Sequence, residues 1–295
     1  MVPFFKKAFF SQEEARDLCA LRVVFCLSTA IVLLAESGFF LGAHLLFPYK
    51  PAGLGRFFFG DFPPSDSTYV TLYAALILAL IFAAVGVRAR IWLLVAIGCY
   101  FAFFSFFQAG LAFGRRYNAT LYLLIILSMS PGVGALRLDR LLWGRGGSSI
   151  LIPSWPVSLA RLTVMIIFFN AGASKLLADP SWYDGRPLQT ILMESAQEGN
   201  KAFLLSWMVE SEIAPRILSV FTLIIELGFV LSFFMPKLIW LYLPAVLVFH
   251  AGCTYYMNVA FFGPLFWCSY LPFFRLSGLE QGLYWLRKRI LAIVF

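Results

Sequence analysis

The sequence predicts an all-α protein: a polytopic transmembrane bundle of about eight spanning helices with both termini in the cytoplasm. Three observations predict it: the mean hydropathy is +0.84, 61% of the 295 residues are hydrophobic, and only 13% are charged. Soluble domains average roughly 45–50% apolar and about 25% charged residues. The 33 Phe, 12 Tyr and 8 Trp suit lipid-facing surfaces and interfacial belts. Since a spanning helix needs about 20 apolar residues, this length allows one bundle with modest loops.

The hydrophobic runs divide the chain in order. After a short amphipathic N-terminal segment, expected to lie on the membrane, the first run covers about residues 18–47 and is interrupted at 36–38. The longest polar stretch, 178–215, contains two weakly amphipathic pieces expected to be interfacial helices. A basic amphipathic tail, 276–295, is expected to lie on an anionic leaflet. We interpret residues 1–295 as a single transmembrane domain, whose later runs are 69–87, 91–113, 117–136, 155–177, 216–235, 238–257 and 259–274.

Basic residues predict the orientation. With eight spans, the side that holds both termini, the 88–90 turn and the 137–145 linker carries roughly twice as many Lys and Arg as the other side. The positive-inside rule then places both termini in the cytoplasm and the 178–215 loop outside, in a cell (inner) membrane. The net charge of +8 therefore reflects orientation. No basic patch interleaved with stacking aromatics indicates a nucleic-acid partner.

Several residues have expected roles in packing. Arg22 and Arg161 lie near the cytoplasmic ends of their runs, where their long side chains can snorkel to the interface. The cysteines lie singly in apolar stretches and form no CxxC pair, so neither a zinc site nor a thiol redox motif is indicated. We expect buried, unreactive thiols and no metal site.

Ionisable residues inside spans are costly and indicate functional sites. Lys175 lies near the outer end of the fifth run, Glu226 lies near mid-membrane, and His250 lies about 18 Å along the seventh run. With Glu36, near the outer end of the first run, these residues could share one pocket in the outer half of the membrane. Plainer interpretations stay open. Lys and Glu could pair only to hold helices together, and His250 could be a packing residue or a haem or chlorophyll ligand.

The stretch RLTVMIIFFNAGASKLLADPSWYDGRPL, residues 161–188, carries an Arg, an apolar run ending in AG-x-x-K-L, and W-x-x-G. It resembles the signature of the HTTM (horizontally transferred transmembrane) family, which includes the vitamin K-dependent γ-glutamyl carboxylase. The matching residues are Arg161, Ala171, Gly172, Lys175, Leu176, Trp182 and Gly185. Further matches are Arg22 in DLCALRVVFC, Glu226 in IIELGFVLSFF, and Phe249 and His250 in VFHAGCTYYMNVAFFGPLF.

The resemblance implies a chemistry. In the carboxylase, the matching lysine is understood to deprotonate a reduced naphthoquinone, which reacts with oxygen. The strong base that forms removes a γ-proton from glutamate, and carbon dioxide adds. Lys175 would be the base, because burial away from water disfavours a charged lysine. His250 would orient the headgroup of reduced vitamin K or menaquinone, and Glu226 would brace the helices. Glu226 is also a candidate substrate- or cofactor-binding residue, together with Glu36, Asn118 and Trp182.

Two features differ from the carboxylase. Its Asn-His pair is matched here by Asn118 and Ala119, and its large outer domain, which grips the protein substrate, has no counterpart in this sequence. Both differences argue against glutamate carboxylation by this chain alone. Short bacterial members also lack that domain, and one of similar size is the membrane subunit that helps mature a secreted toxin of the sporulation-delaying system. The alternative function is therefore a non-catalytic accessory or maturation subunit with a secreted peptide or membrane protein as its partner. A transporter is a third interpretation, disfavoured because the polar groups gather in one half.

Overall fold

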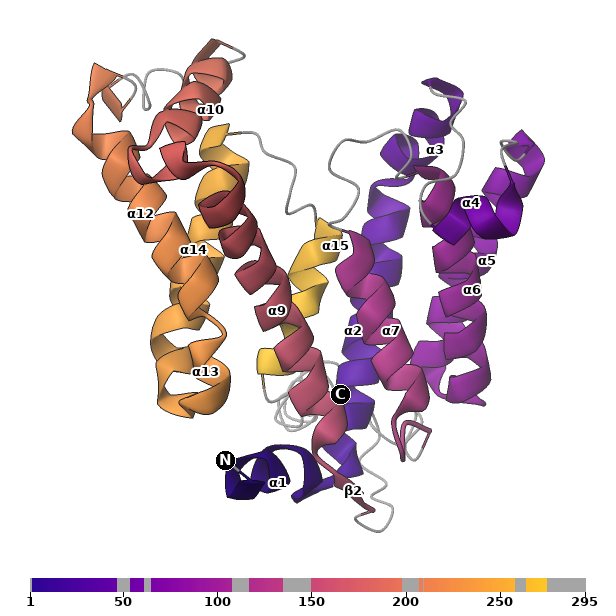
Figure 1. The fold of residues 1–295 in the computed structure, drawn as a ribbon. Helices are drawn as coiled ribbons and strands as arrows, with labels where there is room; N and C mark the ends of the chain where they lie inside the picture. The colour runs from indigo at the N-terminus through magenta and orange to yellow at the C-terminus, as the bar shows by residue number, and fades with distance from the viewer. Residues whose placement is uncertain are drawn as a thin grey trace, which may run out of the picture. The chain divides into compact units, whose positions relative to one another are not determined.

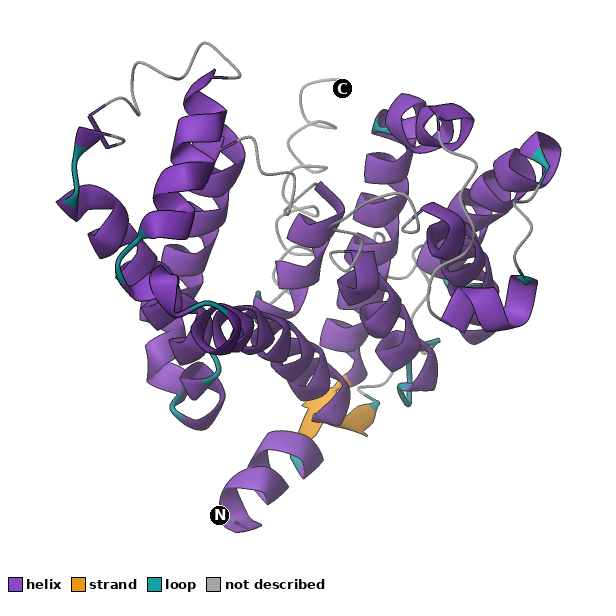
Figure 2. Cartoon of the chain, turned by 45° about the horizontal axis from the view of Figure 1, so that its top comes forward, coloured by secondary structure: helices purple, strands orange, loops and turns teal. Residues whose placement is uncertain are grey.

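The computed structural model describes residues 2–46, 54–60, 65–107, 117–134, 150–197, 207–208, 210–257 and 264–274. These residues are mostly helical, with one small antiparallel sheet (Figures 1 and 2). The predicted all-α class is therefore confirmed. The chain forms two compact units, one from residues 1–160 with 264–295 and one from residues 161–263.

The first unit contains most of the long apolar helices. The strands β1 and β2 pair in antiparallel register, with Glu13 opposite Ile152. The elements of this unit, with the first residues of α9 (Trp155–Ala178), are α1 (Val2–Phe10), β1 (Gln12–Glu14), α2 (Ala15–Ala35), α3 (Ser37–Leu46), α4 (Leu54–Phe59), α5 (Asp66–Val85), α6 (Ala89–Phe107), α7 (Asn118–Met129), β2 (Leu151–Pro153), α15 (Pro264–Trp267) and η6 (Cys268–Phe273).

The second unit contains the rest of α9 and the segments that follow it. A turn at residues 229–230 separates two of its helices, α12 and α13. The polar stretch predicted to hold interfacial helices contains one described helix of three turns, α10. The elements are η3 (Pro180–Tyr183), α10 (Arg186–Gln197), α12 (Ile213–Gly228), α13 (Leu231–Phe234), η4 (Pro236–Leu238) and α14 (Ile239–Met257).

Each hydrophobic run contains a helix, but the helices differ in length. Five described segments are long and apolar enough to cross a membrane: α2, α5, α6, α9 and residues Pro236–Tyr256. The protein is thus an integral membrane protein. By contrast, α7 has 12 residues and extends about 18 Å, which is shorter than a hydrocarbon core of about 30 Å. The count of eight spans and the orientation stay predictions.

Two tyrosine hydroxyls donate hydrogen bonds to backbone carbonyls on either side of the break predicted in the first run. α2 ends at Ala35 with Glu36 as its C-cap residue, and α3 begins at Ser37. The Tyr73 hydroxyl donates to the carbonyl of Leu33 just before the break, and Tyr69 donates to the Phe40 carbonyl just after it at 3.3 Å. Backbone carbonyls in lipid need an internal donor, so these two side chains stabilise the bent first helix.

The prediction that Arg22 snorkels to the interface is wrong. Its side chain is fully buried and donates to the carbonyl of Val133, and to that of Ala84 at 3.4 Å. Arg90 donates to the Ser130 carbonyl in the same turn, at 3.1 Å. Carbonyls at the end of α5 and in the turn after α7 replace water as partners of the guanidinium group, which removes the need to reach the interface.

We expect Arg22→Met to lower the free energy of unfolding by about 1–3 kcal/mol, because buried carbonyls lose a charged donor. Arg88→Met is the control, since Arg88 is exposed. The thermal unfolding midpoint in detergent, measured for both variants, checks this prediction. Equal midpoints would show that Arg22 contributes no more than a surface arginine.

Candidate functional site

One face of α9 supplies the centre of the site. Phe168, Gly172 and Lys175 lie at spacings of four and three residues, so they project from the same side of the helix. Phe168 and Gly172 are buried, and Lys175 is partly buried. The contacts of this face, described below, are with α12 and α14.

Gly172 allows α9 and α12 to approach closely. A Cβ atom added at Gly172 would lie 2.9 Å from Glu226 Cβ and 3.0 Å from Leu227 Cγ, so any side chain there would push the helices apart. The glycine of the AG-x-x-K motif thus has a steric reason. One turn later, the same face of α9 presents a lysine to the same segment of α12.

Lys175 and Glu226 form an ion pair across these two helices. The lysine Nζ donates to both carboxylate oxygens, at 2.5 Å and 2.6 Å. The two ends of the pair differ in access: the Lys175 side chain is 24% exposed, whereas that of Glu226 is 5% exposed. A molecule that reaches the pair from outside the protein therefore meets the amine first.

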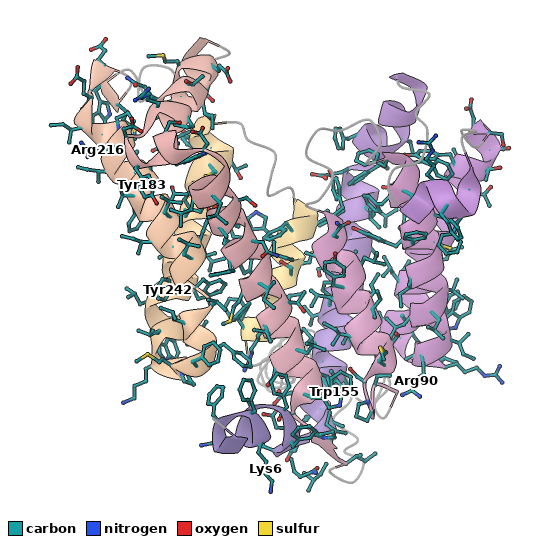
Figure 3. The ribbon with its side chains drawn as sticks, in the orientation of Figure 1. Lys6, Arg90, Trp155, Tyr183, Arg216 and Tyr242 are labelled. Carbon is teal, nitrogen blue, oxygen red and sulfur yellow. The ribbon has the colours of Figure 1, made fainter. Side chains whose placement is uncertain are left out.

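The W-x-x-G loop covers the lysine and is fixed to the start of α12. The Trp182 ring lies under Lys175 Nζ, 5.4 Å from its centroid, a cation–π distance. Ser219 Oγ donates to the Trp182 carbonyl at 2.6 Å. Gly185 adopts a φ of +82°, and a Cβ there would lie 2.5 Å from the Arg216 nitrogen. Figure 3 labels Tyr183 and Arg216 where the loop meets α12.

The turn between α9 and this loop is capped by its own side chains. Asp179 accepts hydrogen bonds from the amide and the hydroxyl of Ser181. These two bonds hold the pKa of the Asp179 carboxyl below its usual range. Pro180 begins the 3₁₀ helix that carries Trp182, a position where proline needs no amide donor. The sequence ADPSW therefore sets the direction in which the tryptophan leaves α9.

His250 is buried among aromatic rings of the same unit. Its side chain is fully buried, and its ring stacks on Phe168 with centroids 4.9 Å apart and planes at 22°. Phe229 from α12 meets the same Phe168 ring edge-on at 5.4 Å. His250 lies close enough to Lys175 to interact with it electrostatically. The Phe168 side chain thus lies between His250 and the backbone of α9.

Four of the six predicted site residues come together in the second unit: Lys175, Glu226, Trp182 and His250. The other two belong to the first unit, where Glu36 caps the end of α2 and Asn118 begins α7. Whether any of these residues is catalytic or binds a ligand stays a prediction.

Sequence reasoning missed two contributors to the site. The first is Phe168, whose ring stacks on His250. The sequence indicated it only through its seven-residue spacing from Lys175, which places both residues on one helical face. Gly228 was the second: the phenol of Tyr242 fills the space where a Cβ would stand, which brings α14 onto α12. Figure 3 labels Tyr242 on this helix. A small residue two positions after Glu226 was the available signal for it.

The residues that meet at this site are those that carried the resemblance to one family. Comparison with known families matches the HTTM domain over residues 10–277. The chain belongs to the HTTM family. The matched region reaches into both compact units. No curated protein and no solved structure matched the chain. In this HTTM protein, the family-like residues Gly172, Lys175, Trp182 and Glu226 are in mutual contact or support one another.

Gly172→Ala should lower the free energy of unfolding by about 1–3 kcal/mol, because the added methyl group overpacks the α9–α12 contact. Gly252→Ala is the matched control: Gly252 also lies in a helix, and a Cβ there meets nothing within 4 Å. That control should be neutral or stabilising by about 0.5–1 kcal/mol. Thermal unfolding in detergent compares the two variants. Equal effects would contradict the close approach at Gly172.

Proposed function

We propose that this HTTM protein is a membrane enzyme in which the Lys175–Glu226 pair takes a proton from a reduced quinone-like lipid of the vitamin K or menaquinone type. The proposal rests on one observation: the enclosed carboxylate of Glu226 accepts a 2.5 Å hydrogen bond from Lys175, whose side chain is 24% exposed. A purely structural ion pair does not require a reachable atom, whereas a proton acceptor does. Lys175 Nζ is that atom, once the ammonium has passed its own proton to the Glu226 carboxylate.

The protons balance if the pair acts as a unit. At rest, lysine and glutamate together hold one net ionisable proton and carry no net charge, whichever group has it. A quinol hydroxyl gives up its proton to the pair, leaving an ammonium on Lys175 and a carboxylic acid on Glu226. The quinolate anion then faces the ammonium, so the complex remains neutral overall. Neutrality matters in lipid, where a lone charge is costly.

The aromatic side chains would position the headgroup rather than transfer protons. Trp182 offers an aromatic face beside the amine, and a planar quinol ring can stack on such a face. His250 is fully buried behind Phe168, so it would act by holding Phe168 and α9 in place. A quinol is soluble in the bilayer, so it would reach α9 through lipid.

The later steps follow the carboxylase resemblance. The quinolate would react with oxygen to give a strong base, which would take a proton from a substrate such as a glutamate of a secreted peptide before carbon dioxide adds. Asn118 and Glu36 lie in the first unit, and their predicted binding roles stay predictions. We assign these steps no residue beyond the proton acceptor.

Saturable binding of a reduced menaquinone analogue to the purified protein tests the proposal. Lys175→Ala should weaken binding at least tenfold, about 1.4 kcal/mol, and His250→Ala should weaken it less, since His250 acts through Phe168. Glu226→Gln should retain part of the binding but lose deprotonation of the bound quinol, read from the absorbance difference between quinol and quinolate. Absence of binding to the unaltered protein would overturn the proposal.

The ion pair also favours a second candidate function, a non-catalytic accessory or maturation subunit. Two helices held by a neutralised pair make a firm surface for a secreted peptide or a partner membrane protein. In that case Lys175 and Glu226 would only brace α9 against α12, with no ligand of their own.

The double variant Lys175→Met/Glu226→Met separates the two candidates. Removing one partner of a buried pair costs about 3–5 kcal/mol, whereas replacing both with apolar groups is often neutral. We therefore expect each single variant to unfold earlier than the double variant, measured by thermal unfolding. If the stable double variant lost quinol binding, the enzyme would be supported. If the protein bound no quinol and the double variant still retained a copurifying partner, the accessory function would be supported.

A further inference from the structure

The helix α1 is tied firmly to the first unit without continuing into it. The Ala8 carbonyl accepts hydrogen bonds from Ser154 Oγ at 3.0 Å and from Ser158 Oγ at 2.6 Å. Ser11 Oγ donates to Ser154 Oγ at 2.9 Å, and the strands β1 and β2 pair immediately afterwards. Figure 1 shows α1 running sideways beside the lower end of α2 instead of prolonging it. If α2 crosses the membrane, a helix that leaves its end sideways runs along the membrane surface.

The side chains of α1 combine exposed phenylalanine with exposed lysine. Phe10 is 67% exposed and Phe5 is 38% exposed, and Lys6 and Lys7 are exposed between them. Lys6 and Phe10 are four residues apart and therefore share one helical face. The helix contains no acidic residue. A lysine can share a face with an aromatic ring at a membrane surface, because its long stem lies along apolar groups while its ammonium reaches the headgroups.

The same end of the first unit carries further exposed arginines. Arg16 lies in the first turn of α2, Arg88 lies in the turn from α5 to α6, and Arg90 lies in the first turn of α6; all three are exposed. Arg22 joins the end of α5 and the turn after α7 to the beginning of α2, which places these arginines at the α1 end. Glu13 and Glu14 are exposed acids at this end, but they lie on β1, outside α1.

We propose that α1 binds an anionic lipid leaflet, with Lys6 and Lys7 contacting the phosphate headgroups and Phe10 entering the acyl boundary. The charge of the basic end is complementary to acidic phospholipid. The hydrogen bonds to Ser154 and Ser158 fix the helix at the depth where both contacts form together. The lipid contacts of α1 thus determine how deep this end of the protein lies in the membrane. This role does not depend on the function of Lys175.

Hydrogen–deuterium exchange tests the proposal on the full chain in nanodiscs of phosphatidylcholine, with and without phosphatidylglycerol. The amides of α1 should exchange about five-fold more slowly per engaged lysine when the anionic lipid is present. High salt should remove this protection, because it screens exposed charges. The amides of α5 and α6 report whether the protein stays folded.

Matched variants assign the effect to residues. Lys6→Gln/Lys7→Gln should abolish the difference between the two lipids. Arg56→Gln, an exposed arginine on α4 at the other end of the same unit, should leave it intact. Phe10→Ala should speed exchange in both lipids. Equal exchange of unaltered α1 in both membranes would overturn the proposal and leave this surface to a protein partner. Protection that persists in the double lysine variant would also overturn it.

Discussion

The second unit depends on one ion pair, between Lys175 on α9 and Glu226 on α12. Burying Glu226 without a partner would be costly, and Lys175 supplies that partner only if α9 and α12 touch at the level where both side chains reach. Gly172 provides that contact, because a side chain there would meet Glu226 Cβ at 2.9 Å. The charge pair and the glycine therefore depend on each other: the pair needs close helices, and the close helices need a residue without a side chain.

The loop after α9 extends the same constraint beyond the helix pair. Trp182 can lie on the lysine only if the chain turns sharply after Ala178, and the Asp179–Ser181 cap provides that turn. Gly185 then passes within contact distance of the Arg216 backbone, which requires both a positive φ and a missing Cβ. The motif residues are thus linked by sterics into one assembly that covers the amine, leaving Lys175 partly reachable and Glu226 enclosed.

Much of this arrangement could be predicted from the sequence, and the part that could not has a common cause. Hydropathy located a helix in each run, and the cost of charge in lipid singled out Lys175, Glu226 and His250. Hydropathy is one-dimensional, however, and cannot report how each helix is rotated or which carbonyls are left open. It therefore missed the Phe168 ring that stacks on His250. The burial of Arg22, where snorkelling was predicted, depends on carbonyls of Ala84 and Val133 that are distant in sequence.

The bracing and the proton-accepting interpretations rest on the same pair, and they differ in what the exposure of Lys175 is for. A brace gains nothing from a reachable amine, because the attraction between Lys175 and Glu226 does not depend on access from outside. A proton acceptor gains from it directly, and it also needs the glutamate nearby to keep the site neutral when a proton arrives. Trp182 bears on the same point: a cation–π contact stabilises the ammonium while leaving its far side open. The asymmetry of the pair is therefore the feature that favours chemistry over mere support.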